Sequence, residues 1–209
     1  VCVENTTNRG GGACWDLEEL KNIKRVCKSH DLAYHLDGAR LWNAMAATKE
    51  SPLEFGKIFN TISICLSKGL GCPVGSILVG SEADMKRALR IRKIFGGGMR
   101  QAGFLAAAGI YALDHHRERL TEDHRRAKEI GTVLAELPFV EHIAPIETNI
   151  IIFGIDEKQV TVAQFIEKLR EKDILLMGMG KGKLRIVTHL DYTENMHEIF
   201  LRELRSLFL

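Results

Sequence analysis

Lys68 is the residue of this 209-residue chain whose position most favours chemistry. It follows an apolar run at residues 61–66 and precedes a glycine-rich turn at residues 69–75. Such a run predicts a strand buried on both faces, and strands of this kind carry functional groups at their carboxyl ends in open parallel sheets. A lysine held there and partly desolvated favours its neutral amine, which attacks carbonyl groups. The alternative is an ordinary lysine at a strand end with its ammonium group in water.

An acidic residue ends a second apolar run. Residues 32–36 predict another short strand, and Asp37 follows it directly, about thirty positions before Lys68. Pyridoxal phosphate requires such a pair, because a lysine holds its aldehyde and a carboxylate keeps its pyridine nitrogen protonated. The two residues together therefore favour a pyridoxal-phosphate site over a lysine without a function.

Four segments around these residues resemble the threonine aldolases, which are pyridoxal-phosphate enzymes of the aminotransferase-like superfamily. They are residues 35–40 (His-Leu-Asp-Gly-Ala-Arg), 66–75 (Leu-Ser-Lys-Gly-Leu-Gly-Cys-Pro-Val-Gly), 92–101 (Arg-Lys-Ile-Phe-Gly-Gly-Gly-Met-Arg-Gln) and 184–189 (Leu-Arg-Ile-Val-Thr-His). The resemblance implies an α/β fold, with the mostly parallel sheet of a fold type I large domain and a smaller C-terminal α+β domain. It begins in the middle of the family's large domain, so we expect an N-terminally truncated chain with domains at 1–120 and 121–209.

The resemblance also assigns roles to particular residues. It implies that Lys68 and Asp37 are catalytic and hold the cofactor, and that no metal is required. Further cofactor contacts are implied for Arg40, Ser67, Lys93 and Arg100, and substrate contacts for Arg185 and Arg40. Arg185 stands between two apolar residues of a predicted strand, where an arginine is seldom found without an anionic partner. That partner is either a structural carboxylate or, as the resemblance implies, the α-carboxylate of a substrate, which suits the fork-shaped guanidinium.

The implied reaction is the retro-aldol cleavage of threonine or allo-threonine, a small β-hydroxy-α-amino acid, to glycine and acetaldehyde. Two alternatives stay open. One is a different pyridoxal-phosphate reaction on the same fold, such as transamination, racemisation or β-elimination, because a fold does not fix a reaction. The other is an inactive fragment that lacks the N-terminal site residues. No residue of the chain can be assigned as the base for the β-hydroxyl group, and His35 is expected to pack beneath the ring or within the sheet.

Composition limits the partners and the cellular compartment that we expect for this chain. Charged residues make up 27% of the chain and the formal net charge is +2, which predicts no nucleic-acid partner and no disorder. No apolar run approaches the roughly 18 residues of a membrane span. The five cysteines form no Cys-x-x-Cys pair and favour reduced thiols. We therefore expect a cytoplasmic enzyme, and the resemblance implies a homodimer or homotetramer.

Periodicity and capping residues predict the elements that position these groups. Asp16, Ser81, Thr161 and Thr193 are expected to begin helices, and His115 and His116 are expected to face solvent. Strands are predicted at residues 1–3, 32–36, 61–66, 76–79, 149–153, 174–177 and 184–187, and further helices at 41–47, 102–115 and 121–137.

Overall fold

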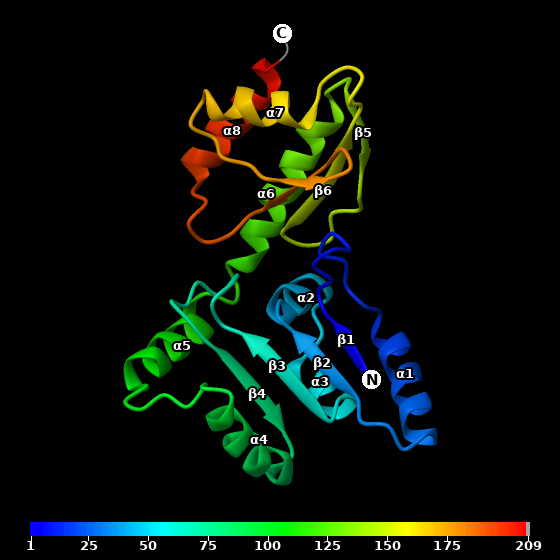
Figure 1. Cartoon of the computed structure of the whole chain (residues 1–209), viewed down its shortest axis with the longest axis vertical. Helices are drawn as coiled ribbons and strands as arrows, with labels where there is room; N and C mark the ends of the chain where they lie inside the picture. The colour runs from blue at the N-terminus through cyan, green and yellow to red at the C-terminus, as the bar shows by residue number, and fades with distance from the viewer. Residues whose placement is uncertain (208–209) are drawn as a thin grey trace. The chain divides into compact units, whose positions relative to one another are not determined.

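The computed structural model describes residues 1–207, and the chain divides into two compact units (Figure 1). The first unit contains residues 1–7 and 14–120, and among the described residues the second contains 8–13 and 121–207. The short segment Asn8–Ala13 therefore belongs with the C-terminal part of the chain, although it lies near the N-terminus in sequence. No helix within residues 1–207 is both long and apolar enough to cross a membrane.

The first unit is built around a four-stranded sheet of order β1-β2-β3-β4, in which the first three strands run parallel and β4 is antiparallel (Figure 1). Its elements are β1 (Cys2–Glu4), α1 (Leu17–Ser29), β2 (His35–Gly38), α2 (Leu41–Thr48), α3 (Pro52–Ile58), β3 (Thr61–Cys65), β4 (Ser76–Gly80), α4 (Glu82–Ile94) and α5 (Gly103–His115).

Helix α1 returns the chain from β1 to β2. Asp16 caps it as predicted, because its carboxylate accepts hydrogen bonds from the backbone amides of Glu18 and Glu19. Leu20 and Cys27 bury the inner face of the helix in the core of this unit. The next strand begins at His35 rather than at residue 32, because the side chain of Asn60 accepts the Tyr34 amide hydrogen that a strand partner would otherwise accept.

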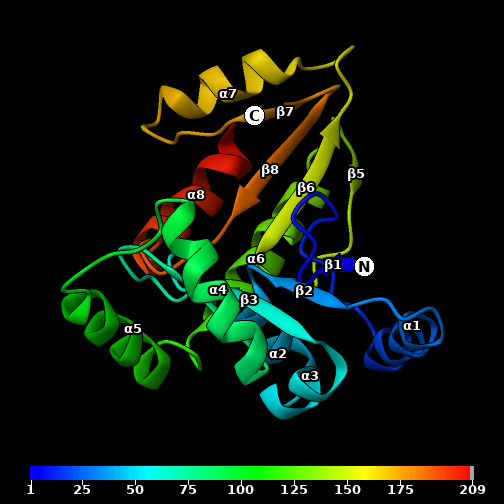
Figure 2. The ribbon, with the colours of Figure 1, turned by 60° about the horizontal axis from the view of Figure 1, so that its bottom comes forward.

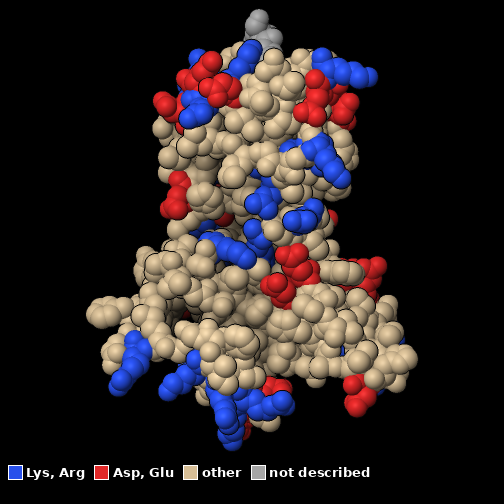
Figure 3. Space-filling view, viewed as in Figure 1, with Lys and Arg blue, Asp and Glu red and all other residues tan. Residues whose placement is uncertain are grey.

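The last elements of the first unit are more exposed than their apolar residues predict. Every residue of β4 is exposed, α4 has no buried residue, and Phe95 and Phe104 are 85% and 91% exposed. Only Ile62 of β3 is fully buried, so the expectation of a strand buried on both faces is wrong within the described chain. Lys and Arg side chains gather over α4 in the space-filling view (Figure 3).

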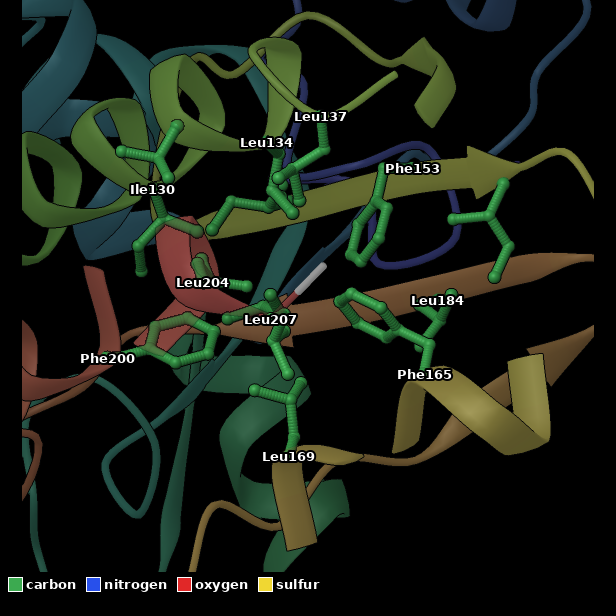
Figure 4. Packing of buried hydrophobic residues seen from close by; sticks show 14 of the residues in the cluster. Ile130, Leu134, Leu137, Phe153, Phe165, Leu169, Leu184, Phe200, Leu204 and Leu207 are labelled. Atoms are coloured by element: carbon green, nitrogen blue, oxygen red, sulfur yellow. The ribbon is translucent and has the colours of Figure 1, made fainter. Parts of the chain in front are cut away.

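The second unit contains an antiparallel sheet of order β5-β6-β8-β7 with three helices. Figure 2 shows the ribbon of these elements in a second view, and Figure 4 shows the buried side chains that join them. The elements are α6 (Leu120–Ala135), β5 (Val140–Ile143), β6 (Ile150–Ile155), α7 (Val162–Arg170), β7 (Gly178–Gly180), β8 (Lys183–Val187) and α8 (Glu194–Ser206). The core includes Phe153, Phe165, Leu184 and Phe200, so both strands and helices contribute to it.

The sequence misplaced one strand of this unit and missed another. Residues 174–177 form no strand, because the Ile174 amide bonds the Leu169 carbonyl at the end of α7 and the side chains of Leu175 and Met177 are about four-fifths exposed (80% and 82%). The strand is β7, which follows this segment and pairs with β8. Strand β5 was not predicted, since its four residues mix apolar and charged types without clear alternation.

A closed ring of polar contacts joins α6 to the start of α8. His197 is 1% exposed, and its Nε2 lies 2.7 Å from Glu129 Oε2 while its Nδ1 lies 3.2 Å from the Tyr192 hydroxyl. Arg125 and Arg126 complete the ring through Glu194 and the Tyr192 carbonyl. Hydrogen bonds from His197 and Arg125 hold the pKa of the Glu129 carboxyl below its ordinary value.

Candidate active site

The carboxyl ends of β1, β2 and β3 lie at one edge of the first sheet, because the three strands are parallel. Asp37 is at this edge, in register with Glu4 of β1 and Ser63 of β3. Its backbone carbonyl accepts a hydrogen bond from the Asn5 amide (3.0 Å), which fixes the end of the strand. This is the edge where open parallel sheets bind ligands.

The carboxylate of Asp37 is half-buried and has spare hydrogen-bonding capacity. Its Oδ1 accepts the backbone amide of Ala39 at 3.1 Å. Within residues 1–207 it forms no ion pair with any lysine, arginine or histidine. A carboxylate in this state can accept a hydrogen bond from a protonated ring nitrogen, and a cationic partner would lower the cost of its partial burial.

Two neighbours of Asp37 differ in what they can contribute. Arg40 precedes the first residue of α2 and is half-buried beside the same strand end. His35 is two residues before Asp37, and its Nδ1 lies 2.8 Å from the Thr61 hydroxyl of β3. The structure thus places His35 against the neighbouring strand of the sheet.

The loop after β3 presents Ser67 and Lys68 to solvent. Leu66 and Leu70 are buried on either side of them, and a turn closes at Lys68 because its carbonyl accepts the Gly71 amide hydrogen at 2.8 Å. The turn has no room for a side chain at Gly69, where a Cβ would lie 2.9 Å from Asn43 Nδ2 and 3.0 Å from Leu120 Cδ2. The buried leucines and the glycine thus fix the loop.

Lys68 lies at the predicted edge of the sheet, three residues beyond the end of β3. The expectation that it is partly desolvated is wrong for the described chain, in which the residue is exposed. Its amine forms no hydrogen bond or ion pair within residues 1–207 and is therefore available to a ligand.

Lys93 and Arg100 are not joined to this edge by any hydrogen bond or ion pair of the described residues. Lys93 is in the last turn of α4, and Arg100 is in the loop that follows it. Both residues are exposed. Their contacts with a cofactor therefore stay predictions from the resemblance.

Arg185 lies in β8, within the second unit. The side chains of a strand alternate between its two faces, and Leu184 and Ile186 face the core, so Arg185 points to the opposite face together with its cross-strand neighbour Ile152. Its NH1 donates a hydrogen bond of 2.7 Å to the side-chain oxygen of Asn8. Among residues 1–207, no aspartate or glutamate forms an ion pair with it. Of the two partners expected for Arg185 from the sequence, a structural carboxylate is therefore not found within residues 1–207.

The comparisons with known proteins identify the family. The profile of the family described as "Beta-eliminating lyase" matches residues 1–158. The chain belongs to the beta-eliminating lyase family. Its match includes Asp37 and Lys68 and ends before β8, so Arg185 lies outside it.

Two curated relatives connect this member of the family to the predicted resemblance. The chain is 36% identical over 195 residues to low-specificity L-threonine aldolase 1 of Arabidopsis thaliana, covering 92% of this chain and 54% of the relative. It is 39% identical over 200 residues to low specificity L-threonine aldolase of Escherichia coli (strain K12), covering 95% and 57%. The resemblance to threonine aldolases is confirmed, and the chain spans about half the length of these relatives.

A solved structure confirms the fold class of this family member. The crystal structure of a putative aromatic amino acid beta-eliminating lyase/threonine aldolase from Exiguobacterium sp. matches with a TM-score of 0.84 at 24% identity. The match covers 99% of this chain and 61% of that one. The α/β large domain with a mostly parallel sheet and the smaller α+β domain are thus as predicted.

Two residues with long-range contacts were missed or misjudged from the sequence. His116 was expected in solvent with His115, but it is half-buried, and its Nδ1 lies 2.6 Å from the carbonyl oxygen of Leu70 in the loop after β3. Asn8 was not singled out as the partner of Arg185, which is 177 positions away. No local pattern could have found either contact, because each joins segments far apart in sequence.

Proposed function

We propose that the protein to which this chain belongs cleaves threonine or allo-threonine to glycine and acetaldehyde with pyridoxal phosphate as cofactor. The observation that carries the proposal is the placement of Asp37 and Lys68 at one edge of a parallel sheet. Each has a charged group without an ionic partner within residues 1–207. The relatives are named as low-specificity threonine aldolases, which supports the choice of substrate.

The donor set at this edge fits the cofactor. The exposed amine of Lys68 would hold its aldehyde, and the half-buried carboxylate of Asp37 would hold the proton of its ring nitrogen. When bound, pyridoxal phosphate supplies a ring that accepts the electrons of a bond broken at the amino-acid α-carbon. Arg40, Ser67, Lys93 and Arg100 are proposed as further cofactor contacts, with Arg40 also near the substrate; this assignment rests on the resemblance of their segments.

Arg185 is proposed to bind the α-carboxylate of the substrate. The support is electrostatic: the guanidinium is half-buried, and its described hydrogen-bond partner is a neutral amide, which does not offset a positive charge. Burial of such a charge is costly unless an anion binds to it in the working protein. A bidentate carboxylate also restricts rotation of the substrate, and orientation selects which bond at the α-carbon is broken.

Substitution of Arg185 by lysine tests this role in the full-length protein. Lysine keeps the charge but loses the planar fork, and a lost charge-assisted hydrogen bond costs about 1.5–3 kcal/mol. The apparent affinity for threonine should fall about tenfold to a hundredfold while the cofactor absorption stays as in the wild type. A variant with lower thermal stability but normal threonine affinity would show that the carboxylate binds elsewhere.

Lys68 can be tested without an activity assay. Borohydride reduction of the cofactor-loaded, full-length protein followed by peptide mapping should place the pyridoxyl group on Lys68. A label on Lys93 would overturn the assignment. In a separate experiment, incubation of the unreduced, cofactor-loaded, full-length protein with threonine should yield glycine and acetaldehyde in equal amounts. A keto acid or ammonia in their place would identify another reaction on this fold. The same assay on the 209-residue chain alone tests the alternative of an inactive fragment, which a lack of product would support.

We also propose a homodimer or homotetramer in the cytoplasm. Support for self-association comes from the exposed apolar residues of the last elements of the first unit, among them Ile94 (70% exposed), Phe95 and Phe104. Sedimentation velocity of the full-length protein should give a mass of two or four chains. A monomer at micromolar concentration would contradict the proposal.

A further inference from the structure

The segment Asn8–Ala13 lies over the face of the second sheet that carries Arg185. A Cβ on Gly11 would meet Ile152 Cδ1 at 3.9 Å, and a Cβ on Gly12 would meet Ile150 Cβ at 3.2 Å. Ile150 and Ile152 are on the same face of β6, and Ile152 is directly opposite Arg185. The two glycines therefore let this segment approach the sheet beside Arg185.

Further contacts hold the segment in place. The buried Thr148 hydroxyl donates a hydrogen bond of 2.7 Å to the Gly12 carbonyl. Both Gly11 and Gly12 have positive φ angles, 76° and 77°, which other residues adopt at a cost. The segment is thus fixed by a close approach and by backbone geometry, so that Asn8 stands at a defined position when it meets the guanidinium.

The chemistry of the contact is selective. Asn8 occupies one of the five N–H donors of Arg185, through NH1, and leaves Nε and NH2 without a partner within residues 1–207. An amide oxygen orients the guanidinium by a hydrogen bond but does not neutralise it. An aspartate at the same position would form an ion pair and compete with any anionic ligand.

We infer that Asn8 is a positioning residue for Arg185, and that its neutral amide keeps the guanidinium oriented and fully charged for the carboxylate of an amino-acid ligand. This inference rests on the proposed function of Arg185. It adds a residue from the N-terminal end of the chain that neither the four resembling segments nor the comparisons assign to this role.

Asn8→Asp in the full-length, cofactor-loaded protein is the decisive variant. The new carboxylate should pair with Arg185, so the midpoint of thermal unfolding should stay equal or rise. The affinity for glycine, measured by calorimetric titration, should nevertheless fall about tenfold to a hundredfold, because a carboxylate at position 8 offsets the charge of Arg185 and repels the carboxylate of the ligand. The affinity for 2-aminoethanol, which has the amine but no carboxylate, should not change.

Controls separate this effect from added charge and from misfolding. Asn195→Asp makes the same change at an exposed position of α8 and should leave both affinities unchanged. Asn8→Ala adds no charge, keeps the inference testable if Asn8→Asp does not fold, and should lower glycine affinity about threefold to tenfold by loss of one neutral-to-charged hydrogen bond. KM should rise more than kcat falls in both Asn8 variants.

Three results have different meanings. Equal glycine affinities in wild type, Asn8→Asp and Asn8→Ala would overturn the inference about Asn8, even if threonine is cleaved. Equal losses of glycine and 2-aminoethanol affinity would overturn it as well, because the effect would then be structural. A wild-type protein that binds glycine but does not cleave threonine would refute the proposed reaction and leave the inference about Asn8 intact.

Discussion

Replacing His197 by phenylalanine should destabilise the second unit strongly. Phenylalanine has a ring of similar size, so the 1% exposed site should keep its packing while both ring nitrogens are lost. The Tyr192 hydroxyl then loses a partner in a largely buried place, which costs about 1–3 kcal/mol. Loss of the hydrogen bond between His197 and Glu129 should cost about 1 kcal/mol more. This figure is kept small because the Glu129 side chain is 41% exposed and can bind water instead.

The expected sum is a loss of about 2–4 kcal/mol in the free energy of unfolding, and a fall of about 5–15 °C in the melting temperature for a chain of this size. Urea denaturation followed by circular dichroism measures the first quantity. Hydrogen exchange should show the largest loss of protection in α6 and α8, which the ring of contacts joins. His142→Phe, at an exposed position of β5, is the matched control and should change stability by less than about 0.5 kcal/mol.

A double-mutant cycle decides whether the hydrogen bonds are responsible. Tyr192→Phe alone should cost about 1 kcal/mol, because it leaves His197 Nδ1 without its partner. In the His197→Phe background the same change should cost nothing or stabilise, because it removes a hydroxyl that has no partner. If Tyr192→Phe costs the same in both backgrounds, or His197→Phe alone costs less than about 0.5 kcal/mol, the reasoning fails.

Three other changes test separate parts of the structure. Gly12→Ala should destabilise the chain by several kcal/mol, because the added Cβ would lie 2.4 Å from Thr148 Oγ1 and residue 12 has a φ of +77°. The matched change Gly56→Ala in α3 places a Cβ where nothing lies within 4 Å, and it should stabilise the chain by about 0.5–1 kcal/mol. Thermal unfolding compares the two variants. Glu129→Gln should lower the free energy of unfolding at pH 7 but not in strong acid. The pKa of the Glu129 carboxyl is lower in the folded chain than its ordinary value of about 4.3, so the stability it contributes is present above that ordinary pKa and is lost as the pH falls through the lowered pKa. Urea titrations at several pH values measure this difference. Asp37→Asn in the full-length protein should retain cofactor absorbance and slow threonine cleavage severely, because an amide cannot hold a ring nitrogen protonated; normal turnover would remove Asp37 from the proposed mechanism.

The sequence determined those features that depend on neighbours within one helical turn. Asp16, Ser81, Thr161 and Thr193 cap helices as predicted, because each side chain accepts an amide hydrogen two or three residues ahead. The positions of Asp37 and Lys68 at one edge of the sheet were also predicted, because each follows a short apolar run and the ends of parallel strands meet at the same edge.

The tertiary structure alone decided which distant groups meet. Periodicity predicted that Arg185 lies in a strand but could not identify Asn8 as its partner. That contact depends on Gly11 and Gly12, which let the segment Asn8–Ala13 approach β6. The exposure of Lys68 and the half-burial of His116 likewise depend on packing that residue type does not reveal. Local hydrogen bonds are encoded by adjacent residues, whereas these contacts arise only when the burial of many apolar side chains has fixed the paths of segments far apart in sequence.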